Sequence, residues 1–161
     1  MKKESLKKLI QVADGQIKAD TVIKNCKIIN VFTGSITEGD IAICDDQIAG
    51  IGQYDGEIEV DGTGKFAAPG FIDSHIHIES SYVSPEELGR LVVPHGTSTI
   101  IADPHEIVNV CGIRGLDYMM NAAQNTALDI KYMLPSCVPS TPFENAGAVI
   151  NAPEMEEPIT R

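Results

Sequence analysis

Residues 66–81 read FAAPGFIDSHIHIESS, an apolar run that ends in a cluster of polar side chains. Two histidines in this cluster, His75 and His77, are separated by a single residue. Residues two apart in an extended strand point to the same side, so we expect both imidazoles to project together from the end of a strand. Two nitrogen donors on a rigid backbone suit one divalent metal ion. The alternative is a pair of partly exposed strand histidines without a ligand.

The residues after this stretch predict alternating helices and buried strands. Ser84 is expected as the N-cap of the first helix, with Pro85 at its first helical position. Apolar strands separated by helices are typical of a parallel sheet covered by helices. Polar residues directly follow each strand, which is where such sheets place their active sites. The expected helix, strand, helix and strand cover residues 84–94, 97–102, 113–124 and 130–138.

The residues before the stretch predict a different architecture. A helix is expected over residues 4–13, and short strands separated by Gly and Asp turns follow between residues 20 and 60. Asp45-Asp46 is expected as a tight turn between two hairpin strands. Strands at this spacing indicate part of a β-sandwich or a small barrel. We therefore expect two domains, the first of residues 1–66 with the helix and a partial β-sandwich, the second of residues 67–161.

Composition excludes several classes of function. The chain has 161 residues, with 12 Lys and Arg against 23 Asp and Glu, a formal net charge of −11. This acidity and the lack of a basic run argue against a nucleic-acid partner. A membrane span and an export signal are not expected either, which predicts a cytoplasmic protein. The cysteines are widely spaced and are expected as reduced, mostly buried thiols, not as disulfides or a thiolate metal site: Cys26, Cys44, Cys111 and Cys137.

Four further polar residues are candidates for the same site. Glu79 shares the parity of the two histidines, so it faces the same cavity if the strand continues. There it could fix a histidine tautomer or contact a substrate, and equally it could be a loop carboxylate in water. Asp103, His105 and Glu106 end the second strand and could bind substrate or support a metal. Glu106 could instead simply begin the next helix, where a carboxylate is favourable.

Other residues near the site are expected to have structural roles. Asp73 is expected to lie deeper on the face of the two histidines, either structural or supporting a metal ligand. His95 is expected to cap the end of a helix. Met119 and Met120 are expected on the buried side of a helix, in the core. Cys137 ends the third strand and is expected to be a buried thiol, although it could line the pocket.

Residues 61–77, DGTGKFAAPGFIDSHIH, resemble the entry signature of the amidohydrolase superfamily, G-x-x-x-x-P-G-F-I-D-x-H-x-H. The resemblance implies a β-sandwich segment before a metal-binding (β/α)8 barrel, with His75 and His77 as metal ligands at the end of the first barrel strand. The fold class expected is α/β, an N-terminal β-sandwich segment followed by the first three β/α units of an incomplete TIM-like (β/α)8 barrel.

Within that superfamily the chain is similar to the adenine deaminase family. The similarity lies in four blocks, VFTG at 31–34, HIHIESS at 75–81, GTSTIIADPHEI at 96–107 and LPSCVPSTPFE at 134–144. It implies hydrolysis of adenine to hypoxanthine and ammonia in purine salvage, with a purine base as the small-molecule partner; the composition already argues against a nucleic-acid or membrane partner. It also implies a divalent metal, Mn²⁺ or Fe²⁺ with Zn²⁺ possible, and a homo-oligomer for the full-length protein.

The length of the chain limits what the resemblance can assign. A (β/α)8 barrel takes about 250 residues, and three of its eight strands are found here. The general base and the remaining ligands would belong to later strands, so we assign no catalytic residue within this chain and expect a truncated N-terminal fragment that is inactive alone. Two alternatives remain, another amidohydrolase (a cyclic amidase or a deacetylase) and a non-catalytic interaction protein that retains half the fold.

Overall fold

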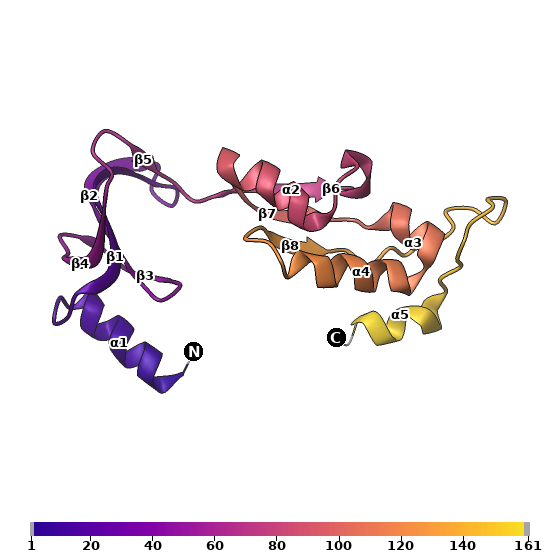
Figure 1. Ribbon diagram of the computed structural model, residues 1–161, viewed down its shortest axis with the longest axis horizontal. Coiled ribbons are helices and arrows are strands. Elements are labelled where there is room, and N and C mark those ends of the chain that lie inside the picture. Colours follow the sequence, from indigo (N-terminus) through magenta and orange to yellow (C-terminus); the bar gives the residue numbers. More distant parts are fainter. Residues whose placement is uncertain (1, 160–161) are drawn as a thin grey trace. The chain divides into compact units, whose positions relative to one another are not determined.

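The structure is a computed structural model that describes residues 2–159, and the side chains of residues 2–156 (Figure 1). It divides into two compact units, Met1–Pro69 and Gly70–Arg161. The division lies three residues later than the boundary expected after residue 66. The reason is that Phe66–Ala67 form a short strand, β5, which pairs with the sheet of the first unit.

The first unit is a helix and a five-stranded mixed sheet. The sheet has the order β3-β2-β1-β4, and β5 also pairs with β1. Strand β2 is antiparallel to β1 and β3, whereas β4 and β5 are parallel to β1. The hairpin turn at Asp45-Asp46 is confirmed. The elements are α1 (Lys3–Ala13), β1 (Ala19–Asn30), β2 (Ser35–Cys44), β3 (Gln47–Gly52), β4 (Gly56–Asp61) and β5.

Strand β1 is one continuous strand that runs through Asn25. Asn25 does not end it but forms a β-bulge with a φ of 56°. Asp40 on β2, which is 4% exposed, accepts hydrogen bonds from the backbone N–H of Asn25 at 2.9 Å and from Lys24 Nζ at 2.6 Å. The partner strand therefore supplies the acceptors that the bulge needs, and the chain stays in the sheet. The strand ends at Asn30, and residues 31–34 form the turn before β2.

Helix α1 covers part of this sheet. Its Val12 is fully buried and packs in a cluster with Val22, Ala42 and Cys44 from β1 and β2. Among the described residues of this unit there is a single sheet, so the second layer of the expected β-sandwich is not confirmed. Apolar side chains of the strands remain exposed, among them Ile36, Ile48, Ile51 and Ile58.

The second unit contains a three-stranded parallel sheet with helices, as expected for a β-α-β arrangement. The sheet has the order β6-β7-β8. Ser84 is the N-cap residue of α2 and Pro85 its first residue, which confirms the start of that helix. The elements are β6 (Phe71–Ile76), the 3-10 turn η1 (Glu79–Ser81), α2 (Pro85–Val92), the 3-10 turn η2 (Val93–His95), β7 (Thr97–Ala102), α3 (His105–Cys111), α4 (Ile113–Ala123), β8 (Asp129–Tyr132) and α5 (Ala152–Ile159).

Three expectations for this unit are wrong. The third strand ends at Tyr132 and not at residue 138, and Pro135 and Pro139 remove two N–H donors from the segment that follows. Cys137 is consequently exposed, not a buried packing thiol. Met120 is 38% exposed although its neighbour Met119 is 2% exposed. Cys111 is exposed as well, so two of the four cysteines are buried, and all four are free thiols.

The core of the second unit lies between the sheet and two helices. Leu88 of α2 and Met119 of α4 pack against Ile100 and Ala102 of β7 and against Ile78, which follows β6. Strand β6, in contrast, has five exposed residues and one half-buried residue. No helix in residues 2–159 combines the length and the apolar character needed to cross a bilayer.

Candidate metal centre

Two neighbouring parallel strands bring candidate metal ligands to one edge of the second sheet. His75 lies on β6 and His77 follows its end, while Asp103 directly follows β7. Ile76 pairs with Ala102 in the sheet register, and the backbone N–H of Asp103 donates to the Ile76 carbonyl at 2.9 Å. The carboxyl ends of β6 and β7 therefore meet at the two histidines and the aspartate, the edge at which parallel α/β sheets hold their sites.

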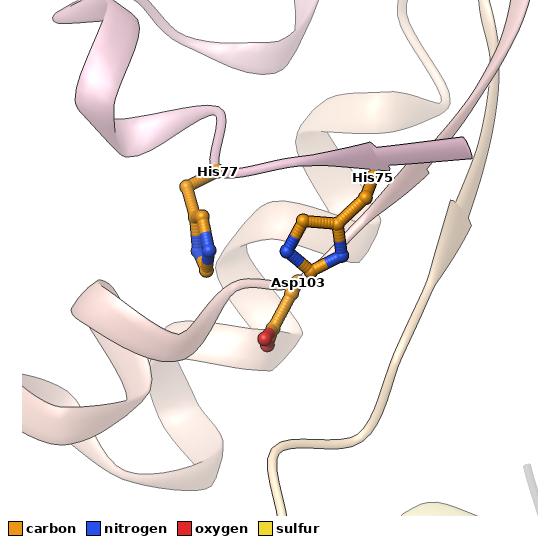
Figure 2. Close-up of side chains that lie close together, drawn as sticks. All are labelled: His75, His77 and Asp103. Atoms are coloured by element: carbon orange, nitrogen blue, oxygen red, sulfur yellow. The ribbon is translucent and has the colours of Figure 1, made fainter. Parts of the chain in front are cut away.

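The three side chains converge (Figure 2). One potential ligand atom from each of His75, His77 and Asp103 lies within 4.8 Å of the other two. The two imidazole centroids are 5.1 Å apart with their planes at 87°. His75 is exposed, and His77 and Asp103 are half-buried. The histidine pair that the sequence places on one side of the chain is therefore joined by a carboxylate from the next strand.

One other group of potential ligands occurs among the described residues, in the first unit, and it already holds a cation. Asp20, Cys44 and Asp45 bring their ligand atoms equally close together. The ammonium of Lys8 lies between the two carboxylates, at 2.8 Å from Asp20 Oδ2 and 3.0 Å from Asp45 Oδ1. That cluster is an ion-pair network that attaches α1 to the sheet.

The donors at the sheet edge fit a divalent metal. His77 Nδ1 and Asp103 Oδ1 are both buried and have no hydrogen-bond partner within the protein. Leaving such atoms unpaired costs free energy, which a bound cation would offset. Imidazole nitrogen and carboxylate oxygen are donors that Mn²⁺, Fe²⁺ and Zn²⁺ accept.

Glu79 does not lie on the side of the two histidines, where the alternation of a continued strand would place it. Strand β6 ends at Ile76, and Glu79 begins the turn η1, so the alternation of a strand no longer applies. Its Oε1 accepts a hydrogen bond from the backbone N–H of Ile107 at 3.0 Å, and its Oε2 is buried without a partner. The carboxylate is therefore not a loop group in water, and it is not one of the three converging side chains.

His105 and Glu106 occupy the first turn of α3. Glu106 Oε1 accepts a hydrogen bond from Ser80 Oγ at 2.6 Å. Glu106 thus lies in the first turn of a helix, where its carboxylate is favourable. It also contacts the turn after β6 through Ser80. His105 Nε2 lies 3.3 Å from the hydroxyl of Ser140, a residue that the sequence analysis did not single out. Ser140 lies within residues 134–144, one of the four blocks that are similar to adenine deaminases.

The remaining residues near the site have local roles. Asp73 is exposed, and its Oδ1 accepts a hydrogen bond from the backbone N–H of His75 at 3.1 Å. His95 is exposed at the end of η2, before Gly96 with a φ of 95°. The hydroxyl of Tyr132 donates to the Met119 carbonyl at 2.9 Å. Burial, and then the charges of Glu79 and Glu86, raise the pKa of Tyr132, so the phenol stays neutral as a donor.

Curated proteins that are highly similar to this chain in sequence are adenine deaminases. The chain is 67% identical over 160 residues to an adenine deaminase 2 of Desulfotalea psychrophila, covering 99% of this chain and 28% of that protein. It is 60% identical to an adenine deaminase of Ligilactobacillus salivarius, with the same coverage of both chains. The chain thus spans about 28% of the length of these relatives. The similarity to adenine deaminases that the sequence blocks indicate is confirmed over nearly the whole chain.

A solved structure and a family profile also match. A zinc-bound N-acyl-D-glutamate deacylase from Bordetella bronchiseptica, in complex with a phosphonate inhibitor, covers 60% of this chain and 19% of its own, with 28% identity and a TM-score of 0.47. The sequence profile described as the amidohydrolase family matches residues 66–160. The matched range is more than half of the chain and includes all three converging residues, and the chain belongs to the amidohydrolase family.

Proposed function

We propose that this chain is the N-terminal part of an adenine deaminase, which hydrolyses adenine to hypoxanthine and ammonia. The observation that carries the proposal is the convergence of His75, His77 and Asp103 at the ends of two parallel strands. The high identity to adenine deaminases over nearly the whole chain supports the choice of substrate.

The chemistry requires a strong nucleophile, because water attacks an aromatic amidine poorly and the exocyclic amine is a poor leaving group. A divalent metal, when bound, lowers the pKa of water from 15.7 to about 7 and so supplies hydroxide at neutral pH. The contribution of this chain is to hold that metal with two imidazoles and one carboxylate. We propose Mn²⁺ or Fe²⁺, and Zn²⁺ fits the same donors.

The first turn of α3 is the proposed substrate side of the site. His105 and Glu106 directly follow the segment that carries Asp103, and Glu106 is exposed. Ser140 holds the ring of His105 from a distant loop, so this imidazole is oriented by a side-chain contact. We propose that these two residues contact the purine base or the ligands of the metal.

The three-stranded sheet is proposed to be the first part of a (β/α)8 barrel. Parallel sheets are normally buried on both faces, yet Phe71 and Ile72 on β6 are 68% and 66% exposed. Further strands and helices would cover these side chains and supply the missing ligands and the general base. We propose accordingly that the 161-residue chain alone does not turn over adenine.

A chimera tests the proposal. Residues 1–160 of this chain replace the aligned part of the Desulfotalea psychrophila enzyme, and the purified chimera is assayed with Mn²⁺ for ammonia release and for conversion of adenine. We expect turnover by the chimera and none by the 161-residue chain. Within the chimera, His75→Ala and His77→Ala are expected to abolish turnover, and the exposed His95→Ala to leave it unchanged.

Other outcomes point to the alternatives. A folded chimera that binds Mn²⁺ and is inactive on adenine, but hydrolyses a cyclic amide or an N-acetyl sugar, would contradict the assignment to adenine. Ammonia release by the 161-residue chain at an enzyme-like rate would contradict the proposed inactivity of this part.

A further inference from the structure

Helix α3 begins without a local cap. Its N-cap residue is Pro104, which has no side-chain oxygen to accept the unpaired N–H groups of the first turn. Glu79 takes this role from 28 residues earlier in the chain, since its Oε1 accepts the N–H of Ile107, the third residue of the helix. A carboxylate is favourable at that end because the helix dipole is positive there.

A second hydrogen bond also joins the turn η1 to helix α3. Ser80 Oγ donates to Glu106 Oε1 at 2.6 Å, so adjacent residues of the turn η1 bind adjacent residues of α3. The turn itself is anchored, because Ile78 is fully buried and its carbonyl accepts a hydrogen bond from Ser81 Oγ at 2.6 Å. The turn η1 and the start of α3 are thus connected by two hydrogen bonds.

These contacts join the two segments that carry the metal ligands. Glu79 lies two residues after His77, and Ile107 lies four residues after Asp103. We infer that Glu79, assisted by Ser80, is a positioning residue of the metal centre, whose hydrogen bond to Ile107 fixes the spacing between His77 and Asp103. This inference rests on the proposed function, because it requires that these two residues bind the metal.

The second carboxylate oxygen of Glu79, Oε2, does not stabilise the fold. Oε2 is buried and has no hydrogen-bond partner within the protein. A buried carboxylate oxygen without a partner destabilises the fold that contains it. The favourable contact of this carboxylate is therefore the one that Oε1 makes with the N–H of Ile107.

The test measures the affinity of the 161-residue chain for Mn²⁺, from the electron paramagnetic resonance signal of free Mn²⁺ during a titration. Removing a group that orients metal ligands typically costs 10- to 100-fold in affinity, so we expect Glu79→Ala to bind Mn²⁺ about tenfold more weakly. Glu79→Gln keeps the accepting oxygen and is expected to stay within about threefold of the unsubstituted chain. Ser80→Ala is expected to lose about threefold.

Glu87→Ala is the matched control, because Glu87 is an exposed glutamate whose ion pair with Arg90 lies within α2. It is expected to leave the Mn²⁺ affinity unchanged. Equal affinity of folded Glu79→Ala and the unsubstituted chain overturns the inference and leaves the proposed function intact. A loss in Glu79→Gln as large as in Glu79→Ala overturns it too, because charge and not the hydrogen bond would then decide.

Circular dichroism shows whether each variant is folded. If Glu79→Ala does not fold, Ser80→Ala decides, and an unchanged affinity in that variant overturns the inference. If neither the unsubstituted chain nor the chimera binds Mn²⁺, the metal centre and this inference are both overturned.

Discussion

Asp103 combines a buried carboxylate oxygen that lacks a partner with a backbone N–H that is bound to Ile76. The side chain and the backbone of this residue therefore have opposite effects on the fold. The backbone hydrogen bond connects β6 to the segment after β7, and the unpaired oxygen destabilises the metal-free state. Residues that bind ligands commonly have this property, because the ligand and not the protein completes their coordination.

Asp103→Ala is therefore expected to weaken metal binding without weakening the metal-free fold. Thermal unfolding is measured with and without Mn²⁺. At a concentration 100 times the dissociation constant, binding stabilises the unsubstituted chain by about 2.7 kcal/mol, and the variant is expected to lose most of that gain. Its unfolding temperature without metal is expected to be equal or higher. A variant of Asp129, which is paired with Lys131 on β8, serves as the control. A lower metal-free unfolding temperature for Asp103→Ala, with the Mn²⁺ effect retained, would contradict a ligand role.

At the scale of elements, the bulge in β1 depends on one carboxylate. Asp40 accepts hydrogen bonds from Lys24 and from the backbone N–H groups of Asn25 and Tyr54, the last at 3.2 Å. Burial raises the pKa of Asp40, but these hydrogen bonds outweigh it and hold the pKa below the ordinary value of 3.8. The ionised form is thus favoured by folding, so its contribution to stability is present above about pH 4 and is lost as the pH falls through the lower pKa of the folded state.

Asp40→Asn is expected to destabilise the chain by about 2 kcal/mol at neutral pH, since a hydrogen bond to a charged group is lost in a buried place. Urea midpoints measured across the pH range test this. The gap between the variant and the unsubstituted chain is expected to be constant above about pH 5 and to shrink below about pH 4. The exposed turn residue Asp46, changed to Asn, is expected to cost less than about 0.5 kcal/mol at any pH. A gap that grows on acidification would contradict the role given to Asp40.

Elements set by local signals are predictable from the sequence, and those set by distant contacts are not. Ser84 and Pro85 predict the start of α2, and Asp45-Asp46 predicts a hairpin turn. These predictions succeed because the residues themselves favour those backbone conformations. The same holds for His75 and His77, whose two-residue spacing at the end of β6 brings their rings together. The continuity of β1 depends on Asp40 of the next strand, and the position of Glu79 depends on Ile107, so neither can be read from neighbouring residues.

At the scale of the whole molecule, both units leave apolar side chains exposed. In the first, a cavity of about 520 Å³ is lined by side chains that include Ile48, Ile51 and Phe32, the last 98% exposed. In the second, Phe71 and Ile72 are exposed on the edge strand β6. Soluble monomers rarely expose contiguous apolar surface of this kind, and unpaired strand edges invite pairing with other chains.

The 161-residue chain alone is therefore expected to bind the dye ANS and to self-associate as its concentration rises. Size-exclusion chromatography over a concentration series, together with ANS fluorescence, measures both. The chimera described above serves as the comparison, and we expect it to bind several-fold less ANS per chain, because added strands and helices would cover these surfaces. A chain that remains monomeric at all concentrations and does not bind ANS would contradict the proposal that further elements cover it.

The pairing of β6 with β7 has a consequence for the order of events during synthesis. His75 and Asp103 are 28 positions apart, and the two strands that carry them are neighbours in the sheet. Contacts between segments so near in sequence form quickly, since little chain entropy is lost in closing the loop between them. The sheet edge that carries His75, His77 and Asp103 can therefore assemble early, once the first turn of α3 has left the ribosome.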